Sequence, residues 1–135
     1  MGLPSFYVEK HYEIIRGKKR LVIDYQPLNM FLQDDKFPLP RRQSMFTFLK
    51  NAQIFSKFDL KSGFWQLGIE PYERYKTAFC IPNAHFQWTV LSFGLKTAPS
   101  IFQKSMVNIF QPILHHALIY IDDILLFSRS HDEHC

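Results

Sequence analysis

The chain has 135 residues, of which 47% are hydrophobic and 21% are charged, and its formal net charge is +4. This length allows one compact domain, or two subdomains packed together, and excludes several independent domains. The composition is that of a globular protein and excludes an intrinsically disordered chain. The basic excess is compatible with a nucleic-acid or nucleotide partner, although the basic clusters at residues 16–20 and 41–42 are explained more simply as a solvated turn and a helix start.

The two cysteines and the length of the apolar stretches indicate in which cellular compartment the chain is expected. Cys80 and Cys135 provide no disulfide framework, so a reducing, intracellular compartment is the default expectation. The longest apolar stretch, residues 118–127, is interrupted by two acids and is far shorter than the roughly 20 residues of a membrane span. We therefore expect no membrane partner.

The first third of the chain alternates short apolar runs with turn residues. Runs rich in β-branched and aromatic residues favour strands, whereas Met45, Phe46 and Leu49 recur at a helical spacing. We expect strands over residues 6–8, 11–15 and 20–25, a hairpin tip at Gly17, an irregular connection over 26–40 and a helix over 41–51.

The rest of the chain mixes strand candidates with one long amphipathic segment. Apolar residues between 98 and 114 predict a helix, with Pro99 in its first turn, where a missing N–H costs nothing. The apolar run over 117–127 predicts two strands hinged on an acid pair. We also expect strands over 53–60, 64–69, 77–81 and 85–91, a helical turn at 72–75, loop positions at His115 and His116, and a helix start at 131–135. This order of hairpins and helices predicts an α+β fold rather than a doubly wound parallel sheet.

The acid pair, Asp122 and Asp123, is the most informative feature of the chain. Two adjacent carboxylates beside apolar side chains repel each other, and a carboxylate taken out of water costs several kcal/mol unless a cation compensates. Mg²⁺ prefers hard oxygen ligands of this kind and binds through carboxylates together with substrate phosphates. The pair therefore predicts half of a phosphoryl-transfer site.

A third carboxylate, Asp59, ends the predicted strand over 53–60. Strand alternation places it on one face with Phe55 and Lys57. If folding brings Asp59 to the acid pair, three carboxylates can hold two cations ~4 Å apart, an arrangement that stabilises the attacking and leaving oxygens of an in-line displacement. The alternative is that Asp59 caps the turn that follows it.

Five segments, in this order and at this spacing, resemble one known family. They are residues 20–29, 58–66, 76–79, 93–103 and 120–123. Together they resemble the reverse transcriptase domain. More narrowly, they resemble the reverse transcriptases of plant pararetroviruses (the caulimovirus and badnavirus group) and of related long-terminal-repeat retroelements. Phe93, where animal retroviruses carry Gln, favours the plant branch.

The resemblance implies a fold and an activity. The fold has fingers, residues 1–40, and a palm, residues 41–135, with an antiparallel palm sheet packed on helices and the chain ending before the thumb. The activity is RNA- and DNA-directed DNA polymerisation on a template–primer, with deoxynucleotides as substrates. The expected setting is a polyprotein that also supplies a thumb and a ribonuclease H segment, in the cytoplasm or in a virus-like particle.

The resemblance also assigns roles to the acids. Asp59, Asp122 and Asp123 are expected to be the catalytic carboxylates around two Mg²⁺ ions, for which Mn²⁺ can substitute. The backbone carbonyl of Leu60 is a further expected metal ligand, and Leu60 is also expected to contact the nucleotide. Such a site positions the primer 3′-hydroxyl against the α-phosphate of the nucleotide and neutralises charge as pyrophosphate leaves.

Other residues match nucleotide-binding positions of the family. Phe64 matches the ring under the nucleotide sugar, which leaves no room for a 2′-hydroxyl, although a core Phe is the commoner explanation when the residue is taken singly. Arg20 matches an arginine that neutralises the triphosphate, and Lys18 or Lys19 is expected to reach a phosphate as well. Gly94 matches a position where the backbone approaches the nucleotide or the template closely.

Other functions compete with polymerisation. A catalytically inactive fragment derived from a retroelement would only bind nucleic acid or protein. A metal-dependent phosphohydrolase is disfavoured because no histidine that could activate water lies beside the acids. A zinc site at His131, His134 and Cys135 is disfavoured because these residues lack a fourth ligand at a standard zinc spacing.

Overall fold

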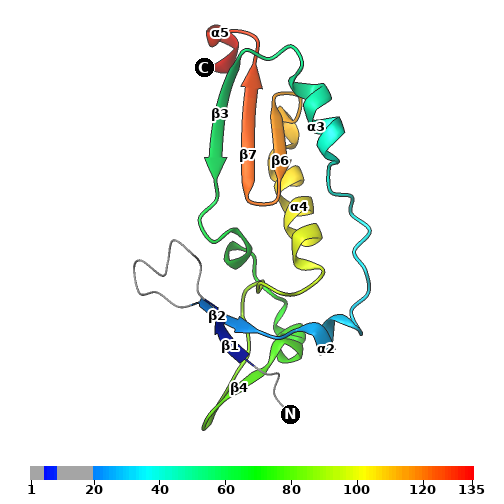
Figure 1. The fold of residues 1–135 in the computed structure, drawn as a ribbon, viewed down its shortest axis with the longest axis vertical. Coiled ribbons are helices and arrows are strands. Elements are labelled where there is room, and N and C mark those ends of the chain that lie inside the picture. The colour runs from blue at the N-terminus through cyan, green and yellow to red at the C-terminus, as the bar shows by residue number, and fades with distance from the viewer. Residues whose placement is uncertain (1–4, 9–19) are drawn as a thin grey trace. The chain divides into compact units, whose positions relative to one another are not determined.

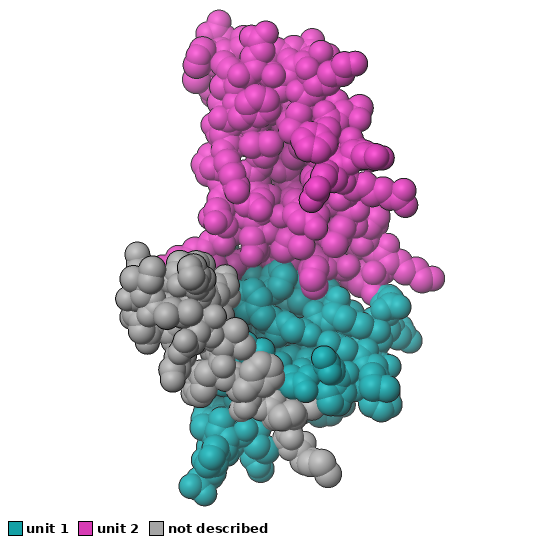
Figure 2. All heavy atoms as spheres, viewed as in Figure 1, with its two compact units in different colours: residues 1–34, 64–98 teal, residues 35–63, 99–135 magenta. Residues whose placement is uncertain are grey.

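The fold is described by a computed structural model for residues 5–8 and 20–135. The chain divides into two units of two segments each: residues 1–34 and 64–98 form unit 1, and residues 35–63 and 99–135 form unit 2 (Figure 2). The division expected at residue 40 lies near the first boundary, but residues 64–98 cluster with the N-terminal segment. The names fingers and palm stay predictions, and the strand expected over 11–15 and the hairpin tip at Gly17 lie outside the described residues.

Unit 1 contains two small antiparallel sheets and short helical elements. The first sheet pairs β1 (Ser5–Val8) with β2 (Arg20–Ile23), and the second pairs β4 (Phe79–Ile81) with β5 (Ala84–Phe86). The β4–β5 turn contains Asn83 at a φ of 66°, a left-handed conformation that asparagine tolerates well. The helical elements are α2 (Gln26–Asn29) and two 3₁₀ helices, η1 (Gly63–Gln66), whose first residue belongs to unit 2, and η2 (Pro71–Thr77).

Aromatic rings fill much of unit 1. The rings of Phe79 and Phe86 stack with centroids 5.9 Å apart. Tyr25 is 1% exposed, and its hydroxyl donates to the carbonyl of Thr77 at 2.9 Å. Burial raises the pKa of Tyr25 above its usual value of 10.0, because the phenolate is poorly solvated there. The buried apolar residues of this unit are Ile23, Tyr25, Phe64, Phe79, Leu91, Leu95 and Ala98.

Unit 2 is built on one antiparallel sheet of three strands. Its strand order is β3 (Ile54–Asp59), β7 (Asp123–Ser128) and β6 (Ala117–Tyr120), so β7 is central (Figure 1). Ile124 and Phe127 lie on opposite faces of β7 and both are buried, as expected of a central strand. α4 (Ala98–Ile109) crosses behind β6 in Figure 1 and contributes Phe102 and Met106 to the core. The remaining elements are α3 (Arg42–Leu49), η3 (Gln111–Ile113) and α5 (His131–His134).

Four predicted elements differ from the structure. The irregular connection expected over 26–40 begins with the short helix α2, and the strand expected over 85–91 is a strand only in β5, Ala84–Phe86, while Val90 forms an isolated bridge. The strand expected over 64–69 is wrong: residues 63–66 form η1, and only Gly68 pairs in a β-bridge, with Val90. The aromatic residues there favour a strand by propensity, but the preceding turn, with Ser62 at a φ of 53°, leads into a 3₁₀ turn instead. The helix expected over 98–114 ends at Ile109, and the chain continues through η3 because Pro112 cannot extend the α-helix.

The mixture of helices and antiparallel sheets confirms the predicted α+β class. The hairpin on the acid pair is present as β6 and β7, the helix start expected at 131–135 is α5, and His115 and His116 lie in a loop as predicted. Among the described residues, no helix is long and apolar enough to cross a membrane.

Candidate active site

The three predicted catalytic acids lie at one end of the unit 2 sheet. Asp59 ends β3 and is the antiparallel partner of Asp123, which begins β7. Asp122 and Ile121 form the two-residue turn between β6 and β7, because Tyr120 pairs with Asp123. The N–H of Leu60 donates to the carbonyl of Asp122 at 3.0 Å and fastens the end of β3 to this turn. Strand register therefore brings together residues that are far apart in the sequence.

The three carboxylates have different surroundings. Asp59 is exposed at the strand end, whereas Asp122 is half-buried and its Oδ1 is enclosed. Oδ1 of Asp123 forms an ion pair of 3.1 Å with Nζ of Lys57, two residues before Asp59 on the same face of β3. Both partners of this ion pair are more than half exposed, so it contributes little to stability. The ammonium group of Lys57 thus lies beside Asp123.

The turn that carries Asp122 has a strained backbone. Ile121 has a φ of 52°, a conformation that costs a β-branched residue about 1–3 kcal/mol. Gln103 of α4, which is 2% exposed, holds this conformation through two hydrogen bonds. Its amide nitrogen donates to the carbonyl of Ile119, and its amide oxygen accepts from the N–H of Ile121, both at 2.7 Å. Gln103 thus pairs the carbonyl of Ile119 in β6 and the N–H of Ile121 in the turn, two backbone groups that would otherwise be unsatisfied.

Close packing positions the Asp122 carboxylate. Gly63 is buried, and a Cβ atom on it would collide with Oδ1 of Asp122 and lie 2.8 Å from Cζ of Phe102. Only a residue without a side chain allows this approach of backbone and carboxylate. Gly63 therefore belongs to the structural support of the acid.

The donor chemistry of this sheet end suits a divalent cation. Three carboxylates and a nearby backbone carbonyl are the hard oxygen ligands that Mg²⁺ prefers. Within the described part of the chain, however, no three His, Cys, Asp or Glu side chains are grouped closely enough to hold a metal ion. Strand register brings the acids to one edge, and their roles as ligands stay a prediction.

Of the predicted nucleotide-binding residues, Arg20, Phe64 and Gly94 belong to unit 1, whereas Leu60 belongs to unit 2. Phe64 is 8% exposed, and its ring lies 5.1 Å from that of Phe93. Gly94 lies in a turn at a φ of 94°, and a Cβ there would meet only ordinary contacts at 3.5 Å, so the backbone conformation is what requires glycine. Arg20 begins β2, whereas Lys18 and Lys19 lie outside the described residues.

Asn29 clamps the turn that contains Gly94. Its amide nitrogen donates to the carbonyl of Gly94 at 2.8 Å, and its amide oxygen accepts from the N–H of Lys96 at 2.9 Å. Lys96 also forms an ion pair of 2.9 Å with Asp34. Residues 20–29 and 93–98, which come from two of the segments that carry the family resemblance, are thereby joined within unit 1.

Comparison with known proteins identifies the family. The sequence matches the family described as reverse transcriptase (RNA-dependent DNA polymerase) over residues 8–135. The chain belongs to the reverse transcriptase family. By family it is therefore a nucleotidyltransferase, as predicted.

The relatives of this reverse transcriptase chain include polyproteins of plant pararetroviruses, which confirms the narrower resemblance. The chain is 68% identical over 130 residues to the genome polyprotein of Petunia vein clearing virus (isolate Shepherd), covering 96% of this chain and 6% of that polyprotein. It is 42% identical over 131 residues to the enzymatic polyprotein of Cauliflower mosaic virus (strain Strasbourg), covering 97% and 19%. The chain thus spans a small part of the relatives it matches.

Solved structures confirm the reverse transcriptase fold. The prototype foamy virus protease-reverse transcriptase (CSH mutant) is 26% identical with a TM-score of 0.83, covering 99% of this chain and 17% of that one. The foamy viral protease-reverse transcriptase in complex with an RNA/DNA hybrid is also 26% identical, with a TM-score of 0.81 and the same coverage. The structure of the foamy viral protease-reverse transcriptase dRH in complex with double-stranded DNA has a TM-score of 0.74 at 28% identity, covering 99% of this chain and 22% of that one.

Sequence reasoning missed the residues that support the acids. Gly63 and Gln103 stand inside the recognised segments but were given no role. The signal for Gln103 was a polar residue next to Phe102 on the apolar face of a predicted helix, where a buried amide needs partners. Strand alternation predicts Lys57 on the face of Asp59, but the ion pair of Lys57 with Asp123 was not predicted.

Proposed function

We propose that this chain carries the catalytic centre of an RNA- and DNA-directed DNA polymerase that works as part of a larger polyprotein. The observation that carries the proposal is the register of unit 2, in which Asp59 pairs with Asp123 and Asp122 occupies the adjoining turn. Membership in the reverse transcriptase family supports the same reaction, the transfer of a deoxynucleotide to a primer 3′-hydroxyl.

Asp59, Asp122 and Asp123, with the carbonyl of Leu60, would hold two Mg²⁺ ions. When bound, these ions neutralise the charge that develops on the attacking and leaving oxygens. The protein's own contribution is to keep the acids in place, through the pairing of β3 with β7, the Gln103 clamp and the space left by Gly63. A rigid set of carboxylates needs little rearrangement during the reaction, which favours catalysis.

The nucleotide would be selected by residues of unit 1. The ring of Phe64 offers no hydrogen-bond partner to a 2′-hydroxyl and takes up its volume, so deoxynucleotides are preferred. Arg20 and one of Lys18 and Lys19 would neutralise the triphosphate. The turn at Gly94, fixed by Asn29, would present backbone groups to the nucleotide or the template.

The partners follow from the relatives. A template–primer duplex is supported by the foamy viral structures, which hold an RNA/DNA hybrid or double-stranded DNA. A thumb and a ribonuclease H segment would come from the same polyprotein, and the cytoplasm or a virus-like particle is the proposed location.

Primer extension tests this function directly. The 135-residue chain is incubated with a primed RNA or DNA template, deoxynucleotides and Mg²⁺ or Mn²⁺, beside the variant Asp122→Asn and the matched control Asp132→Asn, an exposed acid of α5. We expect extension by the unmodified chain and by the control, and none by Asp122→Asn. Extension absent from all three would refute independent catalysis and favour the inactive fragment. Cleavage of nucleotide or phosphodiester bonds without primer growth would instead indicate a phosphohydrolase.

A further inference from the structure

Unit 2 contains a second candidate site, a cavity of about 230 Å³ at the opposite end of the sheet from the acids. It lies where β7 ends at Ser128, whereas Asp123 begins that strand. At about 3.3 Å per residue, the two ends of β7 are roughly 16 Å apart. The cavity is therefore distinct from the candidate polymerase centre.

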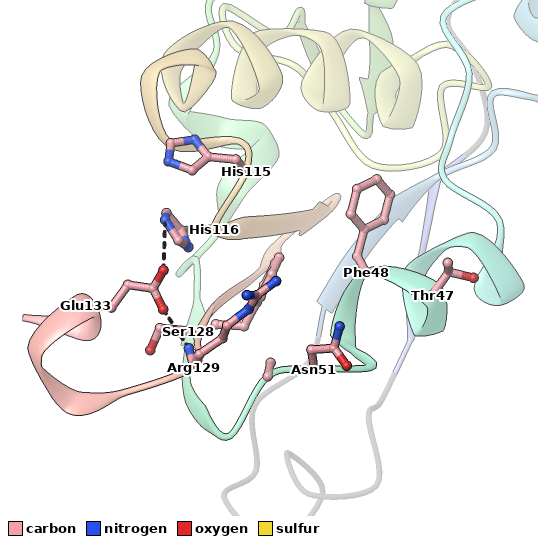
Figure 3. Close-up of a pocket in the computed structure, with 10 residues that line it drawn as sticks. Thr47, Phe48, Asn51, His115, His116, Ser128, Arg129 and Glu133 are labelled. Carbon is pink, nitrogen blue, oxygen red and sulfur yellow. Dashed lines mark hydrogen bonds and ion pairs between the residues drawn. The ribbon is translucent and has the colours of Figure 1, made fainter.

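Figure 3 shows how the cavity is built. The loop residues His115 and His116 lie along one side, and Phe48 and Asn51, from α3 and the turn after it, lie along the other. Arg129, directly after β7, lies between these two sides. Polar groups from three parts of unit 2 thus face one space.

The acid at this cavity is already engaged. Of the described residues that line the cavity, Glu133 of α5 is the only one with a carboxylate. One of its oxygens accepts from the backbone N–H of Arg129 at 2.8 Å, and the other lies 3.8 Å from Nε2 of His116. The carboxylate of Glu133 therefore contacts Arg129 and His116 at the rim of the cavity.

The remaining polar side chains of the cavity can all donate hydrogen bonds. Among the residues that the structure describes, none forms an ion pair with the guanidinium of Arg129. The imidazole of His115, whose ring lies 4.2 Å from that of His116, and the side-chain amide of Asn51 add further N–H groups. A space with one unpaired guanidinium and several N–H donors is complementary to an acceptor-rich anion.

We propose that this cavity binds a phosphate group. A guanidinium matches the geometry of phosphate oxygens with paired hydrogen bonds. The volume is smaller than the roughly 300–1,000 Å³ of pockets for drug-sized ligands, which suits a single phosphate group better than a large organic molecule. The 62% exposed ring of Phe48 offers an apolar surface to whatever carries the phosphate. This proposal does not depend on the polymerase function, because none of the three acids takes part.

The phosphate could belong to a free anion or to a nucleic-acid backbone, and one titration separates the two sources. Backbone and side-chain amide resonances of the ¹⁵N-labelled chain are followed by NMR as inorganic phosphate is added at constant ionic strength, and in a second series as a short single-stranded oligonucleotide is added. We expect saturable shifts at Arg129, His115 and Asn51, with a dissociation constant on the order of 1 mM for inorganic phosphate. Shifts at the same residues by the oligonucleotide at lower concentration would assign the site to nucleic acid, and shifts by phosphate alone would assign it to a free anion.

Two arginine variants make the test specific. Arg129→Ala is expected to weaken phosphate binding at least tenfold, and Arg129→Lys to give a smaller loss because it keeps the charge but not the paired hydrogen bonds. The matched control is Arg42→Ala, an exposed arginine of α3 that does not line the cavity, and it is expected to leave binding unchanged. If Arg129→Ala unfolds the chain, His115→Ala takes its place, with an expected loss of at least threefold. Shifts that do not saturate, or an equal loss in Arg42→Ala, would overturn the proposal.

Discussion

Replacing Gly63 with alanine is expected to displace the Asp122 carboxylate. The new Cβ would collide with Oδ1 of Asp122, approach its Cγ to 3.3 Å and lie 2.8 Å from Cζ of Phe102. The ring of Phe102 is 1% exposed and has little room to move, so most of the displacement falls on the half-buried carboxylate. The candidate metal site would change although none of its acids has been replaced.

The loss of stability expected of Gly63→Ala can be estimated from this crowding. Forcing an extra carbon into a packed site costs typically about 1–3 kcal/mol. For a chain of this size, such a loss lowers the melting temperature by about 3–10 °C. Gly68→Ala is the matched control, because a Cβ there would meet only the carbonyl of Thr89 at 4.0 Å and its φ is not in the left-handed region. We expect that control to lose no stability.

A double-mutant cycle identifies what the new side chain strikes. Urea unfolding is measured for Gly63→Ala in the natural chain and in an Asp122→Ala background, where the carboxylate is gone. The cost of Gly63→Ala should be smaller in that background by at least about 1 kcal/mol, leaving the contact with Phe102. Equal costs in both backgrounds would refute the reasoning, because the carboxylate would then not lie against Gly63. Mn²⁺-induced broadening of NMR signals near Asp122 provides a separate readout, which should weaken in Gly63→Ala and persist in Gly68→Ala.

Three other changes test the remaining structural claims. Gln103→Leu leaves two backbone groups of the hairpin without partners and should cost about 2–4 kcal/mol in urea unfolding, whereas the exposed Gln43→Leu should cost under about 0.5 kcal/mol. Because burial raises the pKa of Tyr25, the folded chain keeps this proton at pH values where the unfolded chain has lost it, so stability holds below pH 10 and falls above it. Tyr25→Phe removes the hydrogen bond to Thr77 and should lower the free energy of unfolding at neutral pH by about 1 kcal/mol. The variant should also lose less stability above pH 10 than the natural chain. An unchanged dependence of stability on pH above 10 would contradict a raised pKa of Tyr25. Lys57→Gln should change the free energy of unfolding by under about 1 kcal/mol, since the ion pair of Lys57 with Asp123 is exposed. The same variant should bind Mn²⁺ more tightly beside Asp123, because a competing positive charge is gone. Weaker Mn²⁺ binding would count against a cation site at this end of the sheet.

The elements near the acids were predictable because their signals are local. An apolar run interrupted by two acids, as over residues 117–127, favours two strands joined by a turn, and the structure has this hairpin. Alternation in the strand over 53–60 correctly placed Lys57 on the face of Asp59. That Asp59 meets Asp123 is a long-range fact, and the family resemblance rather than periodicity predicted it.

The missed features depend on tertiary contacts that no local pattern reveals. The aromatic residues after Gly63 favour a strand by propensity, yet they form η1, next to a turn that brings Gly63 against Asp122. Likewise, a glutamine in a helix is commonly a surface residue, and only the strained turn at Ile121 explains a buried one at position 103. Both features act on the acid-bearing turn, because Gln103 holds its backbone through two hydrogen bonds and Gly63 leaves the space for the carboxylate of Asp122.

The division into units determines how these roles can be separated by experiment. The contacts that position Asp122, from Gly63 and Gln103, lie wholly within unit 2, whereas the buried hydroxyl of Tyr25 and the Asn29 clamp lie wholly within unit 1. Sites without shared partners usually contribute additively to stability. A variant of Gly63 should therefore alter Mn²⁺ binding and leave the alkaline titration of Tyr25 unchanged, and a shift of that titration would show that the two units are energetically coupled.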